Sequence, residues 1–267
     1  MKILGLDISS NSTGWGIIET DPLKLLEYGL VKSDGSMGVT QRLYFFGNEI
    51  KKIIDKFQPD EIAIEETILV RGPKIMRTLA RFSGVAIYLA YCYQKHEIQM
   101  HEPSKWKKGI GLSGSAVKPE VQLKVCEKFC LLDSRKVEDY KKQLEETDQL
   151  EKSIDSSLSK DLREKIKKLD EDEKAFKIRK KEIKNKKKKE VTEFELKELV
   201  DTPLIFEKAR DVIKDKKKQI NDQNKIIDKR YHKISTDIYS DAGINNDIAD
   251  AIAIALFASI IHEEQKL

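Results

Sequence analysis

Cysteine and histidine are scarce in this sequence, and the few that occur are scattered. The three cysteines, Cys92, Cys126 and Cys130, have no zinc-like spacing with the four histidines. We therefore expect free thiols in a reducing compartment and no histidine-centred catalysis. The sequence also lacks an apolar run of membrane-spanning length and a basic segment that leads into a signal sequence. These absences predict a cytoplasmic protein that is not secreted and has no membrane partner.

Charged residues are abundant but unevenly spread along the 267 residues. Between Arg135 and His232, 30 lysines and arginines and 24 acidic residues fall within 98 positions. The two flanks have the charge content of an ordinary globular domain. We therefore expect one discontinuous domain, residues 1–134 and 235–267, interrupted by a charged insertion over residues 135–234.

The flanks predict an α/β layer architecture. Short apolar runs bounded by turn residues predict strands, and the short turns between the first three imply an antiparallel meander. After a first strand that ends near residue 7, we expect strands over residues 14–20, 25–32, 61–65 and 96–101. Apolar residues at helical spacing predict helices over residues 39–57, 76–93 and 245–258.

The insertion carries an apolar residue at every seventh position, which is the pattern of a coiled coil. The two series are Leu162, Leu169, Phe176 and Ile183, then Leu199, Phe206, Ile213, Ile220, Ile227 and Ile234. We expect an antiparallel helical hairpin that reverses near residues 185–189. Thr202 and Pro203 resemble an N-cap followed by proline, so the return helix is expected to be interrupted there. Such an arm is either a solvated spacer or a contact for DNA, for a protein partner or for a second copy.

The first apolar stretch, MKILGLD, ends in a carboxylate. A buried carboxylate is costly unless it is paired or binds a metal, so Asp7 needs a reason to stand at the end of a buried strand. One reason is ordinary, because aspartate often caps a strand-to-turn junction. The other possible reason is a metal-binding site, to which other carboxylates of the chain would contribute.

Two other apolar segments also carry carboxylates at one end. The run IAIEE ends in Glu65 and Glu66, of which only one can face the site because neighbours in a strand point to opposite sides. Asp247 and Asp250 lie one helical turn apart, where acidic residues also suit the start of a helix. Together these carboxylates would repel one another without a cation, and oxygen-only ligands favour Mg²⁺ or Mn²⁺ over zinc.

Four stretches together resemble the RuvC family of Holliday-junction resolvases, within the ribonuclease H-like superfamily. They are LGLDISSNSTGWGII, IAIEETIL with the later RFSGVAIYLA, KKGIGLSGSAVKPEVQ, and NNDIADAIAIA. The similarity covers roughly residues 1–133 and 236–262, in the order of the family. It implies a ribonuclease H-like fold, in which a mixed five-stranded sheet is flanked by helices.

The resemblance implies an acidic tetrad that holds two Mg²⁺ ions, with Mn²⁺ as a substitute. Residue by residue, the tetrad falls on Asp7, Glu65, Asp247 and Asp250, and Glu65 rather than Glu66 matches the family. The sequence departs from the family where Ser9-Ser10, or Ile8-Ser9, replaces a usual Pro-Gly, and where Ile68 replaces an aromatic residue. Such a site implies phosphodiester hydrolysis by two metal ions.

Basic residues near these motifs are candidates for contacts with the DNA backbone. Lys107 and Lys118 match the DNA-contacting segment of the family best, and Lys108 lies beside them. Arg71, Lys74 and Arg77 could add phosphate contacts from the start of the second helix. The alternative is a flexible basic surface loop and ordinary solvated charges.

The predicted function is that of a Mg²⁺-dependent, structure-selective endonuclease that resolves Holliday or related branched DNA junctions. A homodimer is expected, because two opposed strands must be cut and two-fold symmetry supplies two sites. One alternative is an actin-like phosphotransferase or ATPase, although the sequence shows no second glycine-rich phosphate loop. The other is a non-catalytic coiled-coil protein that binds branched DNA, which a missing carboxylate would have favoured.

Overall fold

The computed structural model describes residues 1–66, 72–94, 98–185 and 192–264. The chain divides into two compact units. The first, here called the sheet unit, comprises Met1–Leu144 and Tyr231–Leu267, and the second, the arm unit, comprises Glu145–Arg230. The arm unit is therefore shorter at both ends than the insertion expected over residues 135–234.

A mixed five-stranded sheet in the order β3-β2-β1-β4-β5 forms the centre of the sheet unit. The first three strands are antiparallel neighbours, whereas β4 runs parallel to β1 and β5 runs parallel to β4. This confirms the predicted α/β class and the antiparallel meander. The strands are β1 (Lys2–Asp7), β2 (Ser12–Thr20), β3 (Leu23–Lys32), β4 (Glu61–Glu65) and β5 (Met100–His101).

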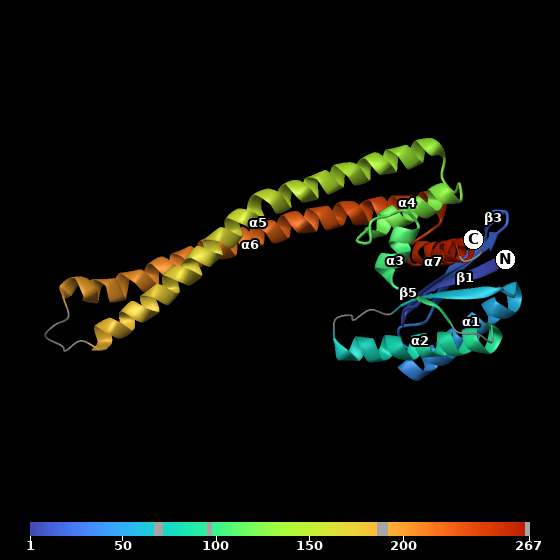
Figure 1. Cartoon of the computed structure of the whole chain (residues 1–267), viewed down its shortest axis with the longest axis horizontal. Helices are drawn as coiled ribbons and strands as arrows, with labels where there is room; N and C mark the ends of the chain where they lie inside the picture. The colour runs from blue at the N-terminus through green and yellow to red at the C-terminus, as the bar shows by residue number, and fades with distance from the viewer. Residues whose placement is uncertain (67–71, 95–97, 186–191, 265–267) are drawn as a thin grey trace. The chain divides into compact units, whose positions relative to one another are not determined.

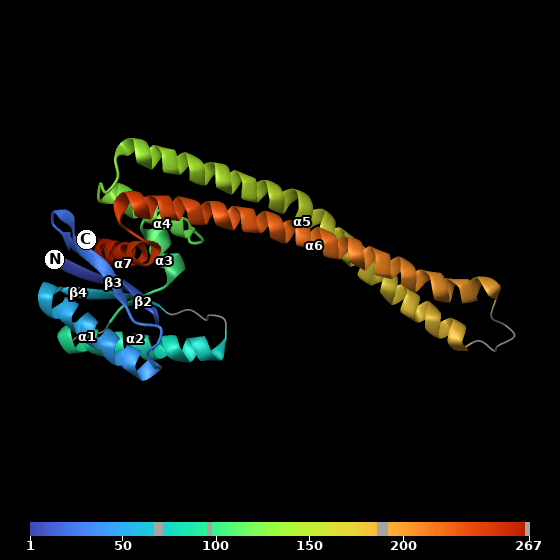
Figure 2. The same ribbon diagram turned by 180° about the vertical axis from the view of Figure 1, so that it is seen from behind.

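Helices cover both faces of this sheet (Figures 1 and 2). One face packs against α1 (Val39–Phe57) and α2 (Pro73–Gln94), whose buried Phe46 and Phe82 meet edge to face. The other face packs against α3 (Pro103–Gly109), α4 (Lys118–Lys128) and α7 (Asn246–Glu264). Helices α3 and α4 were not predicted from the sequence. Their buried residues alternate with lysines and glycines, so no clear helical pattern of apolar residues is visible.

The C-terminal helix α7 lies unusually close to β1 and β2. A Cβ atom added to Gly5 would lie 1.9 Å from the carbonyl oxygen of Ala251, and one added to Gly14 would lie 1.9 Å from that of Asp247. Any larger residue at these positions would push the helix away from the sheet. The glycines therefore determine how closely the first turns of α7 approach the end of β1.

Within the sheet unit, the start of the long helix α5 (Ser134–Asn185) and the end of the long helix α6 (Glu193–Ala242) pack in a cluster of their own. Val137, Tyr140 and Leu144 of α5 pack there with Ile234 and Ile238 of α6 and with Leu123 and Cys126 of α4. The Tyr140 hydroxyl also donates a hydrogen bond to Asp241 at 2.8 Å. This packing explains why residues 135–144 and 231–234 belong to the sheet unit rather than to the insertion.

Within the arm unit, α5 and α6 form the predicted antiparallel hairpin. The rings of Phe176 and Phe206 lie 5.6 Å apart, and Arg210 of α6 pairs with Glu173 of α5 at 2.6 Å. The heptad residues Leu162, Ile183 and Ile227 are buried. The reversal predicted near residues 185–189 falls largely outside the described residues.

The predicted interruption at Thr202 and Pro203 is wrong, because α6 runs continuously through Pro203. The helix begins instead at a capping box, in which the Glu195 backbone N–H donates to Thr192 Oγ1 and the Thr192 N–H donates to the Glu195 carboxylate. Proline removes one helical hydrogen bond, but the packing of Phe206 against Phe176 one turn later favours the continued helix.

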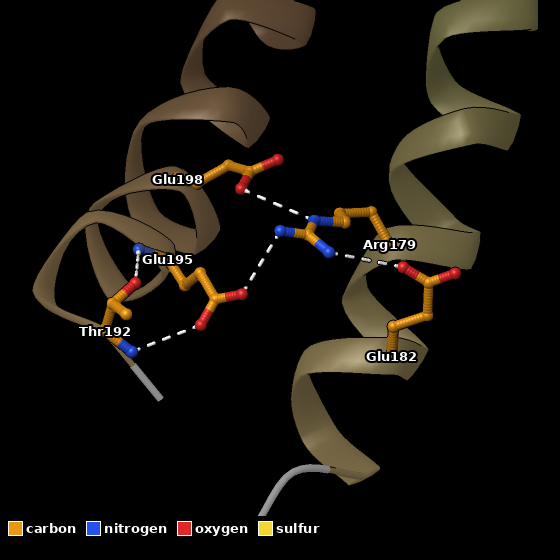
Figure 3. A network of polar contacts seen from close by, with 5 residues as sticks. All are labelled: Arg179, Glu182, Thr192, Glu195 and Glu198. Carbon is orange, nitrogen blue, oxygen red and sulfur yellow. Dashed lines mark hydrogen bonds and ion pairs between the residues drawn. The ribbon is translucent and has the colours of Figure 1, made fainter. Parts of the chain in front are cut away.

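An ion-pair network holds the two helices together near the distal end of the hairpin (Figure 3). The Arg179 guanidinium pairs with Glu195 at 3.1 Å and with Glu198 at 3.9 Å across the hairpin, and with Glu182 on its own helix. The Glu195 side chain is buried, so this pair excludes water better than the exposed pairs along the arm.

None of the described helices is by itself both long and apolar enough to cross a membrane. Only α6 and α7 taken together, as a bent pair, satisfy the length and composition criteria.

Replacing residues 149–228 with a short Gly/Ser linker should leave the sheet unit folded. The replacement keeps Tyr140, Leu144, Ile234 and Ile238 in place, and closing a loop between nearby ends costs little free energy. We expect a soluble protein with a cooperative thermal transition, measured by circular dichroism. A matched replacement of residues 137–230 also removes Val137, Tyr140 and Leu144, and should be markedly less stable. Equal stability of the two variants would contradict this role of the cluster.

Candidate active site

The parallel pairing of β1 and β4 places Asp7 and Glu65 at the same edge of the sheet. Each carboxylate ends its strand, and the register pairs Leu6 with Ile64 immediately before them. Gly5 faces α7, so Asp7, two residues along, points to the same side of the sheet. Ala63 is buried against the same helix, which places Glu65 on that side as well. The exposed Glu66 must then point to the opposite side.

The start of α7 brings the other two carboxylates to this edge. The side-chain oxygen of Asn245 accepts a hydrogen bond from the Ile248 N–H at 2.9 Å, which caps the helix. Gly14, which pairs with Asp7 across β1 and β2, lies directly beneath the backbone of Asp247. The Ser12 hydroxyl donates a hydrogen bond to the Asp247 carboxylate at 3.1 Å.

The pKa values show that these carboxylates interact. Burial raises the pKa of Asp7 well above its usual range, and the negative charges of Glu65 and Asp247 raise it further. Burial also raises the pKa of Glu65, as does the charge of Asp250. Their side-chain hydrogen bond also raises the pKa of Asp7 and lowers that of Glu65. Burial, followed by the charge of Asp7, raises the pKa of Asp250 to about 7.

Two of the predicted lysines lie near enough to stabilise the ionised carboxylates. Lys107 lowers the pKa of Glu65 and of Asp250, and Lys118 lowers the pKa of Asp7 and of Asp250. Lys107 is half-buried on α3, and its ammonium group donates a hydrogen bond to the Ala116 carbonyl at 2.8 Å. Lys118 is the first residue of α4 and is exposed. The basic segment is therefore anchored at helices rather than being a wholly flexible loop.

The other predicted basic residues are less closely tied to this cluster. Lys108 is exposed on α3. Lys74 and Arg77 are exposed on the first turn of α2, where the Arg77 guanidinium donates to the Pro73 carbonyl at 3.2 Å. Arg71 and Ile68 lie outside the described residues.

The donor set suits a hard divalent cation, since all four candidate ligands are carboxylates and three of them have raised pKa values. Their side chains are not already arranged as a coordination shell. Among the residues that the structure describes, no three His, Cys, Asp or Glu side chains form a group that could hold an ion.

Sequence reasoning missed two residues that contact this cluster. Ser12 belongs to the polar turn after β1, and its position beside Asp247 depends on the docking of α7. Trp106 is buried on α3 and lowers the pKa of Glu65, although its indole nitrogen makes no hydrogen bond of normal geometry with the described residues. An aromatic residue directly before Lys107 was the only available signal, and it is equally typical of a core position.

The mixed sheet, with its first and fourth strands ending in carboxylates beside α7, has the five-stranded α/β arrangement that the resemblance implied. The family model described as crossover junction endodeoxyribonuclease RuvC matches residues 3–143. The chain therefore belongs to the RuvC family, a family of hydrolases, which confirms the resemblance and the predicted class of enzyme. The matched span ends before α7, so the assignment of Asp247 and Asp250 depends on the geometry described above.

Two relatives and one solved structure show how far the similarity extends along the chain. A crossover junction endodeoxyribonuclease RuvC from Wolbachia sp. subsp. Drosophila simulans is 33% identical over 124 residues, which cover 45% of this chain and 76% of the relative. The enzyme of the same name from Dictyoglomus thermophilum is 28% identical over 141 residues, covering 52% and 89%. Among solved structures, T. thermophilus RuvC in complex with a Holliday junction substrate has a TM-score of 0.44 at 19% identity, covering 50% of this chain and 82% of that one.

The repulsion within the cluster predicts a stabilising substitution in the absence of metal. A raised pKa means that the folded protein is most stable while Asp250 is protonated, and that this stability is lost as the pH rises from about 4 to about 7. In EDTA at pH 8, Asp250→Asn should therefore stabilise the folded protein and raise its melting temperature. The expected gain in the free energy of unfolding is on the order of a few kcal/mol. The difference should vanish near pH 4. Thermal denaturation across this pH range measures it, with Glu66→Gln as the control that should change little.

Proposed function

We propose that this protein is a Mg²⁺-dependent endonuclease that resolves four-way DNA junctions. The observation that carries the proposal is the gathering of Asp7, Glu65, Asp247 and Asp250 at one edge of the sheet in a RuvC-family chain. The names of the relatives supply the substrate class, because they are crossover junction endodeoxyribonucleases.

In this proposal the four carboxylates hold two Mg²⁺ ions, and Mn²⁺ can replace them. Two ions at such a site activate a water molecule and stabilise the leaving oxygen during phosphodiester hydrolysis. Asp7 is the candidate for a ligand shared by both, because it is hydrogen-bonded to Glu65 and interacts with Asp247 and Asp250.

The basic residues beside the carboxylates bind the DNA backbone in this proposal. Lys118 is exposed at the start of α4, and Lys107 and Lys108 lie on α3. Lysines attract phosphates without reading base sequence, which suits an enzyme that recognises a branched shape. Arg71, Lys74 and Arg77 are proposed to extend this contact.

A homodimer is proposed because α2 exposes several large apolar side chains. Ile75, Tyr88 and Tyr91 are 51%, 67% and 54% exposed, and Ile87 lies beside them at 37%. Aromatic residues are enriched in protein interfaces, and a two-fold axis through this face would supply one site for each of two cleaved strands. The arm unit is proposed to serve as a further contact for DNA or a protein partner.

The first alternative, an actin-like phosphotransferase, has less support. Family membership and the clustered carboxylates both favour a nuclease. The second alternative, a non-catalytic binding protein, would not require four carboxylates to be held together against their repulsion.

Neutralising the site should separate cleavage from binding. Asp7→Asn, Glu65→Gln, Asp247→Asn and Asp250→Asn each remove one ligand while they keep the side-chain shape. Each should reduce cleavage of a labelled four-way junction in Mg²⁺ by a factor on the order of 100 or more, with binding retained. Glu66→Gln is the matched control and should cleave normally. Near-normal cleavage by Asp7→Asn would rule out the proposed site.

Removing the lysines should weaken the electrostatic part of DNA binding. Each phosphate contact that is lost reduces counterion release, so the slope of log affinity against log salt concentration should become smaller by about one for Lys118→Ala. Lys107→Ala should do the same, and electrophoretic mobility-shift titrations at several salt concentrations measure both. Unchanged slopes in both variants would place the DNA elsewhere.

A charge on the outer face of α2 should separate the proposed dimer. Tyr88→Glu buries an unpaired carboxylate in such an interface, so light scattering should report a monomer. Tyr44→Glu on α1, where the tyrosine is 76% exposed, is the matched control and should leave the mass unchanged. A wild-type monomer at micromolar concentration would contradict the dimer.

A further inference from the structure

The outward face of α5 in the arm unit carries a stripe of charged residues that are almost all basic. They recur at alternating intervals of four and three positions, so they lie along one face of the helix. All six are exposed, and they are Arg163, Lys167, Asp170, Lys174, Lys177 and Lys181. The last three follow one another with no acidic residue between them on this face. This set is called the α5 stripe below.

The apolar seam of the hairpin lies on the other side of α5. Ile183 is buried, and the ring of Phe176 packs against that of Phe206 on α6. Lys174 precedes Phe176 by two positions. Lys181 precedes Ile183 by the same interval, and two positions turn an α-helix by roughly 200°. These lysines therefore point away from α6, and the packing of the hairpin does not explain them.

The carboxylates nearest to the end of the α5 stripe are engaged by other cations. Glu173 pairs with Arg210 of α6 at 2.6 Å, and Glu182 pairs with Arg179 at 3.4 Å in the network of Figure 3. Within the described part of the chain, the last three lysines of the stripe form no ion pair. Like charges three and four positions apart repel, so an uncovered stripe weakens its own helix.

The outward face of α6 has the same spacing but a different charge pattern. Its residues, all exposed, are Lys208, Asp211, Asp215, Lys218, Asp222, Lys225 and Lys229. Asp222 pairs with Lys225 at 3.0 Å. A surface that only keeps a protein soluble mixes both signs of charge, as this face does. The excess of one sign on α5 therefore indicates a negatively charged partner.

We propose that the α5 stripe binds the phosphate backbone of duplex DNA, as a contact separate from the candidate active site. The inference rests on the proposed action of the protein on DNA, but not on the four carboxylates. From Arg163 to Lys181 the stripe spans roughly 27 Å of helix. Duplex DNA carries one negative charge per roughly 1.7 Å of its axis, so the stripe is long enough to contact several phosphates. Lysines bind phosphates without reading base sequence, which suits the duplex on either side of a branch point.

A stripe variant tests this contact in the full-length protein. It combines Lys174→Gln, Lys177→Gln and Lys181→Gln, and glutamine is a good helix former, so the arm should stay helical by circular dichroism. Fluorescence anisotropy with a labelled linear duplex in EDTA gives the slope of log affinity against log salt concentration. The slope should become smaller by about two to three, because each phosphate contact contributes about 0.9. Affinity at low salt should fall at least roughly tenfold.

A matched control separates a specific surface from the total charge. Lys208→Gln, Lys218→Gln and Lys229→Gln together remove the same three charges from the outward face of α6. This variant has the net charge of the stripe variant, but its slope should change by less than about one. A wild-type slope in the stripe variant would overturn the proposal, and so would equal decreases in both variants. Normal DNA binding by the stripe variant, with loss of wild-type binding to poly-glutamate, would assign the stripe to an acidic protein instead.

Cleavage assays on the same proteins separate this inference from the proposed function. DNA binding that requires the α5 stripe, in a protein that does not cleave a four-way junction in Mg²⁺, would support the stripe and contradict the nuclease. Junction cleavage by the wild type, with duplex binding that is unaffected in the stripe variant, would support the nuclease and overturn the stripe.

Discussion

The close approach of α7 to the sheet is the constraint on which the candidate site depends. The helix can lie directly on β1 and β2 only because Gly5 and Gly14 have no side chain at the points of contact. That approach places Asp247 opposite the end of β1 and brings Asp250 near enough to Asp7 for their charges to interact. The site is therefore assembled from the two ends of the chain, with the insertion between them.

The resulting repulsion has a physical cost that the rest of the sheet unit only partly offsets. Burial and like charges raise the pKa values of Asp7, Glu65 and Asp250, and a hydrogen bond between Asp7 and Glu65 relieves part of the repulsion. Lys107 and Lys118 contribute opposite charge from α3 and α4. A divalent cation would remove the remaining repulsion, which is why a binding role explains the cluster better than a structural one.

Much of the fold was predictable from the sequence, because periodic apolar patterns are local. The helix expected over residues 39–57 occurs with those bounds, and the first four predicted strands pair in the sheet. Of the strand expected over residues 96–101, the structure pairs only Met100–His101, and residues 96 and 97 lie outside the described residues. The capping box at Thr192 and Glu195 was not anticipated, although its Thr-x-x-Glu spacing is visible in the sequence. The continuous helix through Pro203 was not anticipated because packing between Phe176 and Phe206 outweighs local preference. The limits of the arm unit also escaped prediction, since charge content does not show which turns pack into the core.

For the site, sequence motifs identified the carboxylates but not what surrounds them. Asp7 and Glu65 each follow a short apolar run, and a carboxylate directly after an apolar run is visible in the sequence. The neighbours of the carboxylates are set by tertiary contacts, as with Ser12 beside Asp247 and Trp106 beside Glu65. Nothing in their local sequence distinguishes these two residues from an ordinary turn serine and an ordinary core tryptophan.

The central claim is that the four carboxylates form one divalent-cation site. Crystals soaked in Mn²⁺ test it most directly, because anomalous scattering locates the ions without reference to activity. We predict anomalous peaks beside Asp7, held by its carboxylate together with those of Glu65, Asp247 and Asp250. Crystals that diffract well and show no peak beside Asp7 at millimolar Mn²⁺ would contradict the account.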